Sequence, residues 1–367
     1  MVNLRKNLSN VFGWRTKRKI VVIESDDWGS IRTRSKKDYD AMLSKGLELD
    51  RSIFTKYDCL ESNADLENLF EVLFRHKDFT GRPVVFTPMS IMANPSFEKI
   101  KASGFSEYAY EPFTETCKSY PNHDRVHALW QKGIKERLFV PALHGREHLN
   151  VSRWMKELRN ENEGLRLAFE HQSVGASWYK GCRLPAYLAA FDPETEVDIQ
   201  SYTKIIETGA AIFQSTCGYE PRYFIASNSP EPKSLEKVLK MAGVDYLTRY
   251  KFQKYPLGNG KFSYELNWLG KHNKQDQVIL TRNCGFEPSD PSNKDWVDAC
   301  MSEIENAFKW HKPAIVSSHR VNYVGFIHHD NAAFGLKELD RLLTNIINRW
   351  PDVEFMQSVE LGDLIDD

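Results

Sequence analysis

Residues 19–29, Lys-Ile-Val-Val-Ile-Glu-Ser-Asp-Asp-Trp-Gly, restrict the possible fold of this chain more than any other stretch. Their run of four aliphatic residues is typical of a strand that is buried on both faces, as in parallel sheets covered by helices. Three carboxylates follow at once: Glu24, Asp26 and Asp27. Neighbouring carboxylates repel each other unless a cation or a shared proton relieves them, and parallel α/β folds carry their sites at the carboxyl ends of strands. The stretch therefore predicts an α/β fold with a site at this strand end, and the alternative is a solvated turn that caps a helix.

The size and charge of the chain exclude several functional classes. Its 367 residues, of which 41% are hydrophobic, suffice for one large α/β domain or two ordinary ones. The 49 basic and 50 acidic residues are well mixed and leave a net charge of -1, so no global field attracts nucleic acid. No internal repeat, low-complexity segment or linker divides the chain. We therefore predict a single domain over residues 1–367 and no nucleic-acid partner.

The cysteines and the N-terminal segment bear on location. The six cysteines show no paired close spacing, which argues against a zinc ribbon or a disulfide framework and favours reduced thiols. The first residues lack the apolar core of a signal peptide, and no run of about 18 apolar residues is available to span a bilayer. These features predict a cytoplasmic protein. Residues 1–18 predict a short basic helical segment that packs on the domain, and the alternative for residues 1–19 is weak contact with a membrane surface.

About eight strands alternate with helices along the chain. Apolar runs after the first strand predict further strands at 82–87, 138–143, 223–226, 245–248, 278–282, 314–318 and 353–356. Helical periodicity predicts helices between them, residues 150–200 are expected to be largely helical, and 88–121 are expected to form a long loop at the functional end. This alternation calls for right-handed crossovers and a parallel sheet, closed as a barrel or open.

A pair of histidines stands where the third predicted strand ends. His144-Gly-Arg-Glu-His148 places two imidazoles four residues apart, so that both can reach one metal ion. His123 and His127 have the same spacing but lie in a helix that leads into a strand, so we expect a structural or surface pair. Because the carboxyl ends of parallel strands share one face, His144 and His148 can meet the acids of the first strand. Two nitrogens and an oxygen form a zinc-type donor set with an open position.

A third strand end adds another histidine. His319 comes just past the strand predicted at 314–318, on the same face of the fold. The simplest role for a lone histidine at this point is a hydrogen bond to a loop carbonyl. The agreement of three strand ends indicates instead that His319 belongs to one site together with the acids and the histidine pair.

These motifs, in this order, resemble the polysaccharide deacetylase superfamily, the NodB-like or carbohydrate esterase family 4 proteins. The resemblance runs through most of the chain and includes Pro221-Arg-Tyr-Phe224 after a helix. It implies an α/β fold, a distorted (β/α) barrel with seven or eight parallel strands and long loops at their carboxyl ends.

The resemblance also implies a role for each residue of the site. Asp26 would be the general base and His319 the general acid. Asp27, His144 and His148 would hold one divalent metal ion, with Zn²⁺ as the expected ion.

The chain departs from the family pattern in ways that bear on substrate contacts. Phe224 is followed by Ile-Ala-Ser-Asn-Ser instead of an Arg-Pro-Pro-Tyr-Gly type motif, so the arginine that contacts the catalytic aspartate has no local counterpart. Arg282, Arg146 and Arg320 are the candidates to replace it. Asn228 or a nearby backbone amide would supply an oxyanion contact.

Two more positions near the motifs, Gly145 and Trp28, bear on the candidate site. Gly145 stands where the family prefers Ser or Thr. Trp28 would either stack on a sugar ring or belong to the core. Together with Asn228, Arg282 and Arg320, Trp28 is a predicted substrate contact.

The function expected from these features is that of a metal-dependent hydrolase that removes an N- or O-acetyl group from a carbohydrate or a sugar-containing precursor. A first alternative is a glycoside hydrolase that uses paired carboxylates, with Glu24, Asp26 and Glu147 as candidates. A second alternative is a non-catalytic carbohydrate-binding relative of such enzymes. Bound metal separates the first two, because a carboxylate pair needs none.

Overall fold

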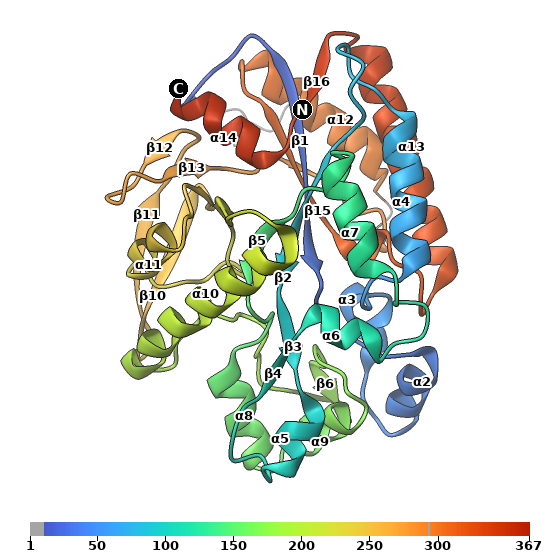
Figure 1. Ribbon diagram of the computed structural model, residues 1–367, viewed down its shortest axis with the longest axis vertical. Helices are drawn as coiled ribbons and strands as arrows, with labels where there is room; N and C mark the ends of the chain where they lie inside the picture. The colour runs from blue at the N-terminus through green and yellow to red at the C-terminus, as the bar shows by residue number, and fades with distance from the viewer. Residues whose placement is uncertain (1–10, 293) are drawn as a thin grey trace.

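A ten-stranded sheet forms the centre of the computed structural model, which describes residues 11–292 and 294–367 (Figure 1). All of its neighbouring strands pair in parallel except β12 and β13. In spatial order the strands are β12 (Lys271–His272), β13 (Val278–Leu280), β9 (Tyr246–Thr248), β8 (Tyr223–Phe224), β5 (Ala142–Gly145), β2 (Phe86–Ile91), β1 (Lys19–Trp28), β15 (Ala314–His319) and β14 (Cys284–Gly285), and β16 (Val353–Phe355) also pairs with β1. The sheet curls into a half-barrel that stays open between β12 and β14.

Strand β1 lies at the middle of this sheet and contributes to both sides of it. Val21 and Ile23 join the large core between the sheet and the helices, whereas Ile20 and Val22 join a smaller core inside the curl. This alternation follows from the two-residue period of a strand, in which successive side chains point to opposite faces. An apolar run is therefore required here because both faces of β1 are buried.

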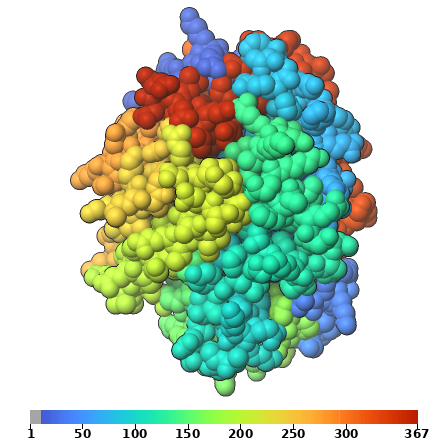
Figure 2. All heavy atoms as spheres, viewed as in Figure 1, coloured from blue at the N-terminus to red at the C-terminus, as the bar shows by residue number. Residues whose placement is uncertain are grey.

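Helices cover the outside of the half-barrel, and in the same view their atoms hide the central strands (Figure 2). Those that carry most of the packing are α4 (Asn63–Arg75), α7 (Val126–Lys135), α10 (Glu196–Cys217), α11 (Leu235–Met241), α12 (Trp296–Lys309) and α13 (His329–Arg349). Local signals set their ends. Helix α4 begins with a capping box of Ser62 and Asp65, and α10 ends at Gly218 in the left-handed conformation.

The remaining elements lie at the two ends of the barrel. Helix α14 (Ser358–Asp366) packs Leu361 and Ile365 into the inner core, beneath the start of β1. At the opposite end are short elements: α2 (Lys36–Ser44), α3 (Ile53–Lys56), α5 (Phe97–Ala102), α6 (Phe113–Lys118), α8 (Val151–Arg159), α9 (Glu163–Glu170), the antiparallel pair β3 and β4 (Ala93–Pro95, Tyr110–Pro112) and the hairpin β6–β7 (Trp178–Tyr179, Cys182–Arg183). The two strands β10 (Phe252–Gly258) and β11 (Lys261–Leu266) form a separate antiparallel hairpin on one flank.

The predicted α/β class and the parallel sheet are confirmed, and all eight predicted strands occur. Strands β12 and β14 of this sheet were not predicted, because two residues are too few to show a pattern. The prediction of a long loop over 88–121 is wrong, since this stretch contains most of β2 and the elements from β3 to α6. The helical expectation for 150–200 holds for α8 and α9 but fails between residues 171 and 195, where a hairpin and irregular chain follow.

The predicted N-terminal helix is not formed over residues 11–18. Residues 1–10 lie outside the described residues, and 11–18 contain no helix. Instead, the side chain of Lys312 donates to the backbone carbonyls of Phe12, Gly13 and Trp14, each at 2.7 Å. These bonds hold residues 12–14 in an irregular, non-helical conformation. Among the described helices, none is long and apolar enough to cross a bilayer.

Candidate active site

A bulge at the end of β1 turns both aspartates toward one cavity. In a regular strand Asp26 and Asp27 would point to opposite faces. The pairing of β1 with β2 shifts register between Ser25 and Trp28, and Asp27 has a left-handed φ of 81°. A bulge of this kind re-aims side chains and is frequent beside functional sites. Both carboxylates therefore line the same cavity.

Asp27 lies beside the two histidines that follow β5. The oxygen Oδ1 of Asp27 is 3.0 Å from Nε2 of His148 and 3.6 Å from Nε2 of His144, and all three side chains are buried. Among the described residues, Asp27, His144 and His148 form the one group of at least three His, Cys, Asp or Glu side chains that lie close enough together to hold a metal ion. His144 Nδ1 lies 2.8 Å from the carbonyl of Ile225, which makes Nδ1 the donor and leaves the lone pair of Nε2 directed at Asp27.

Backbone conformation explains the glycine between these histidines. Gly145 has a φ of 141°, which L residues with side chains rarely adopt. A Ser or Thr at this position, as the family prefers, would be strained. The departure from the family pattern is therefore a local backbone requirement of this chain.

An arginine that sequence reasoning missed holds the other oxygen of Asp27. Arg32 Nη2 lies 3.3 Å from Asp27 Oδ2, and Arg32 also pairs with Asp58. Burial alone would raise the pKa of Asp27, but the nearby His148 and Arg32 lower it well below its ordinary value. Asp27 is therefore held as a carboxylate with one oxygen toward the histidines.

Arg320 belongs to the support of this network and not to the cavity. Its fully buried guanidinium pairs with Asp58 at 3.0 Å and with Glu61 at 2.9 Å. The prediction that Arg320 contacts substrate is therefore wrong, because solvent and substrate cannot reach the side chain. Its role is to neutralise carboxylates that would otherwise be buried alone.

Asp26 is held by Arg282, which follows β13. Arg282 donates from Nη2 to Asp26 Oδ1 at 2.6 Å and from Nη1 to Asp26 Oδ2 at 2.7 Å, while its Nε donates to Glu24 at 2.6 Å. Burial on its own would raise the pKa of Asp26, but the charge and hydrogen bonds of Arg282 lower it below its ordinary value. Of the three arginines considered as replacements for the missing family arginine, Arg282 is thus the one that contacts Asp26. Arg146 instead lies over the ring of Tyr110 at 4.0 Å.

His319 reaches the same cavity from the end of β15. Its Nε2 lies 3.8 Å from Asp26 Oδ2, and its Nδ1 lies 2.6 Å from Glu287 Oε1. Burial would lower the pKa of His319, but Glu287 and then Asp26 raise it to about 9. Sequence reasoning missed Glu287, since it follows the two-residue strand β14 and no motif marks it. Asn322 donates to the other oxygen of Glu287 at 2.7 Å and orients it.

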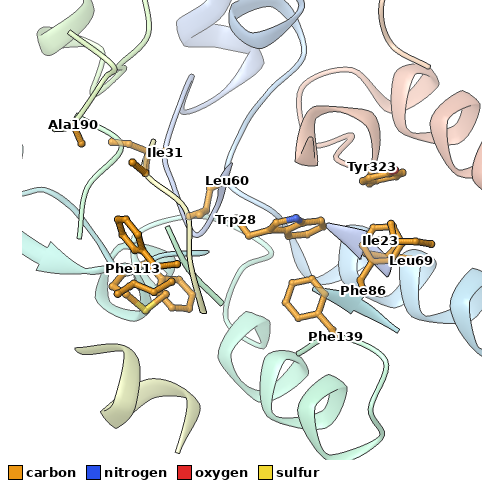
Figure 3. Close-up of a cluster of buried hydrophobic side chains, with 14 of the residues drawn as sticks. Ile23, Trp28, Ile31, Leu60, Leu69, Phe86, Phe113, Phe139, Ala190 and Tyr323 are labelled. Carbon is orange, nitrogen blue, oxygen red and sulfur yellow. The ribbon is translucent and has the colours of Figure 1, made fainter. Parts of the chain in front are cut away.

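The cavity that these residues share has a volume of about 1220 Å³. Asn228 and Arg282, which the sequence analysis names as expected substrate contacts, line it together with Tyr250, Trp296, Asp26 and His319. Trp28 does not. It is fully buried, lies 4.9 Å from Phe139 in an edge-to-face contact and donates to Ser25, so the prediction that it stacks on a sugar is wrong (Figure 3).

The second histidine pair behaves as predicted. His123 is buried and bonds the carbonyls of Pro121 and Leu60, whereas His127 is exposed and contacts the carbonyl of Thr216. The two rings therefore serve local structure. The same spacing at His144 has a different outcome because His144 stands at a carboxyl strand end.

Comparison with known proteins gives a likeness of fold. No protein-family model and no curated protein sequence matches the chain. Similar solved structures include a protein described as a polysaccharide deacetylase. It comes from Mycobacterium smegmatis, with 11% identity, a TM-score of 0.46 and coverage of 96% of this chain and 92% of that one.

Two further solved structures show the range of the likeness. The Xyl-CE4 domain of a multidomain xylanase from the hindgut metagenome of Trinervitermes trinervoides has 9% identity and a TM-score of 0.39, covering 95% of this chain and 91% of that one. The 4-alpha-glucanotransferase from Thermococcus litoralis has 10% identity and a TM-score of 0.45, covering 94% of this chain but 40% of that one. At these values the function has to be inferred from the site itself.

Proposed function

We propose that this protein is a metal-dependent hydrolase that removes an N- or O-acetyl group from a carbohydrate or a sugar-containing precursor. One observation carries the proposal. Asp26 and His319 lie 3.8 Å apart in one cavity, beside the donor set of Asp27, His144 and His148. Hydrolysis of an amide or ester needs a base for the attacking water, an acid for the leaving group and stabilisation of the developing oxyanion.

The environments of Asp26 and His319 suit opposite proton-transfer roles. Arg282 keeps Asp26 ionised, so that it can accept the proton of an attacking water. Glu287 keeps His319 protonated near neutral pH, so that it can give a proton to the departing amine or alcohol. Paired groups whose pKa values are pushed apart in this way are typical of acid and base assignments. Asn228, at the cavity wall, would contact the oxyanion.

The donor atoms fit a divalent metal ion of the zinc type. Two Nε2 atoms and one carboxylate oxygen gather within 4.8 Å of one another, and Ile225 fixes the tautomer of His144. Three protein ligands of this kind leave an open position, as in catalytic zinc sites. When bound there, the ion would polarise the substrate carbonyl and favour ionisation of water. Asp27, His144 and His148 are thus the proposed ligands, with Zn²⁺ as the expected ion.

The geometry does not favour the glycoside hydrolase alternative. Glu24 is fully buried below the cavity, where Arg282, Tyr223 and Ser358 bond it. Glu147 is buried against Arg146. Neither carboxylate lines the cavity, so neither of the predicted partners is positioned to act with Asp26 on a glycosidic bond. A non-catalytic binding relative would have no use for the separate pairing of His319 with Glu287.

The proposal is tested by metal content and acetate release. Purified protein is expected to hold about one Zn²⁺ per chain, and Asp27→Ala and His144→Ala are expected to lose it. His127→Ala is the matched control, because it belongs to a pair of the same spacing outside the cavity. Failure to bind zinc, or equal zinc binding by the Asp27→Ala variant, would contradict the proposed ligand set.

The catalytic roles need a second set of variants. Asp26→Asn and His319→Gln are expected to keep the metal and to lower the rate of acetate release from N-acetylated and O-acetylated sugars by about 10²- to 10⁴-fold. Wild-type protein that holds zinc and releases no acetate from either class would favour the binding relative instead.

A further inference from the structure

The hairpin β10–β11 presents one side of its two strands to solvent. The register pairs Phe252 with Leu266, Lys254 with Tyr264, and Pro256 with Phe262, and directly paired residues share a face. We call Phe252, Lys254, Phe262, Tyr264 and Leu266 the outer hairpin face. Side chains at the alternate positions, such as Gln253 and Tyr255, are buried against the rest of the molecule. The hairpin lies on the left flank of the view in Figure 1.

Large apolar side chains are concentrated on this surface. Of the 13 that are exposed among the described residues, seven lie between positions 250 and 268. Phe252 is 65% exposed, Tyr264 57% and Leu266 55%, and the rings of Phe252 and Tyr264 stack at 5.3 Å. Contiguous exposed apolar surface on a folded protein marks a site of interaction.

The hairpin is also held firmly enough to present a defined surface. Gln253 donates to the carbonyl of Ser229 and accepts from the backbone of Tyr250. At the turn, the backbone N–H of Asn259 donates to the carbonyl of Glu194, just before α10. The inner side is thus bonded to the molecule, and the outer hairpin face is the side left to a partner.

The charged residue of the outer hairpin face itself is a lysine, and the exposed acids nearby, Glu194 and Glu196, lie beside the turn. None of the five residues of the face is acidic, and Lys254 Nζ lies 3.3 Å from the ring centre of Phe262. Lys261, at the turn, is exposed as well. The nearby Glu265 is directed to the inner side, where Lys233 and Lys271 bond it.

Further cations gather at the base of the hairpin. Phe12, which is 67% exposed, lines a small cavity with Lys251, Trp268 and the buried Lys312. Arg15 is exposed on the adjoining chain. Apolar and basic groups therefore continue from the hairpin onto the chain around residues 12–15.

We infer that the outer hairpin face docks this protein on an anionic lipid surface. Aromatic and leucine side chains can enter the interfacial region of a bilayer, and lysines are attracted by anionic headgroups and extend toward them. A second copy of the chain is a poorer partner. A two-fold contact through this face would bring the Lys254 side chains together, and the outer hairpin face has no carboxylate to place between them.

The position of the face gives this docking a consequence for the active site, which rests on the proposed function. Tyr250 lines the cavity of Asp26 and His319 and comes two residues before Phe252. Docking through the hairpin would therefore bring the cavity mouth near the membrane surface, where a saccharide carried on a lipid is the substrate best placed to enter.

Sedimentation with vesicles tests the docking. The full chain is expected to sediment with phosphatidylcholine vesicles that contain phosphatidylglycerol, and not with phosphatidylcholine alone. Phe252→Ser with Leu266→Ser is expected to weaken binding about tenfold or more, and Lys254→Glu about tenfold. The matched control is Phe74→Ser with Phe79→Ser, which removes side chains that are 57% and 58% exposed outside the hairpin and is expected to bind as wild type does.

Several outcomes would overturn the docking. The first is that the protein sediments with neither kind of vesicle. The second is that the control variant loses as much vesicle binding as the hairpin variants do. The third is a concentration-dependent dimer that the hairpin variants abolish, which would make the face a contact between copies of the chain. The result does not depend on the proposed enzyme activity, because Asp27→Ala should sediment as wild type does. A protein that binds vesicles but neither zinc nor acetylated sugar would keep the docking and lose the proposed function.

Discussion

At the scale of single residues, two adjacent buried carboxylates in the candidate site are each neutralised by a separate arginine. Asp26 is paired with Arg282 and Asp27 with Arg32. Without these partners the two charges would raise each other's pKa and share a proton. The separation leaves Asp26 free to act with His319 and Asp27 to face the histidines.

The clearest prediction at this scale concerns Glu287. His319 has a pKa of about 9 in the folded chain against 6.5 for an ordinary histidine, so the folded state binds its proton more tightly than the unfolded state. The stability gained is fully present below pH 6.5 and is lost as the pH rises through about 9. Glu287→Gln removes the main cause of the raised pKa, so the decline in stability between these pH values should become shallower.

Two measurements on metal-free protein check this prediction. Urea unfolding across the pH range measures the decline in both proteins, and NMR titration of the His319 ring measures its pKa directly. An unchanged pKa of His319 in Glu287→Gln would show that Glu287 does not set the protonation of the proposed acid.

At the scale of elements, the proposed acid His319 is positioned by helix α13 through the segment that follows β15. Gly335 in α13 packs so closely on this segment that a Cβ atom built on it would lie 1.7 Å from the carbonyl oxygen of Asn322. Asn322 in turn orients Glu287, which holds His319. The glycine thus sets how near the helix can approach the segment that carries the acid.

Gly335→Ala is therefore expected to destabilise the protein, although alanine is the better helix former. The intrinsic gain of about 1 kcal/mol should be outweighed by overpacking, giving a net loss of about 1–3 kcal/mol in the free energy of unfolding. Urea unfolding measures the change, and Lys337→Ala, at an exposed position of the same helix, is the control. A Gly335→Ala variant more stable than wild type would show that the helix can move away at no cost.

At the scale of the whole molecule, α14 closes the end of the barrel opposite the site. Leu361 and Ile365 complete the inner core with Ile20 and Val22, and Ser358 donates to Glu24 at 2.7 Å. Hydrogen bonds through Glu24 and Arg282 thus connect this end of the barrel to Asp26 in the candidate site. The C-terminal helix supports the site without touching the cavity.

Leu361→Ala tests how much the packing of α14 contributes to the stability of the fold. Leu361 is fully buried, so its truncation should lower the free energy of unfolding by about 2–5 kcal/mol, whereas Leu257→Ala at an exposed position should change it little. Denaturant unfolding of both variants provides the comparison. Equal effects of the two changes would mean that α14 is not part of the folded core.

The sequence alone determined eight of the ten strands of the central sheet and the principal residues of the candidate site, because both depend on local pattern. Buried strands show as apolar runs, and residues at the carboxyl ends of parallel strands meet whatever the details of packing. Asp26, Asp27, His144, His148 and His319 could therefore be grouped from the sequence, and the structure places all five around one cavity.

Only the tertiary structure decided which other side chains support that group. Arg282 and Asp26 are 256 positions apart, and Glu287 follows a strand too short to recognise. Whether Trp28 and Arg320 face substrate or core depends on how distant helices and loops cover them, and both prove fully buried. Burial and charge pairing are properties of long-range packing, and a pattern along the chain does not contain them.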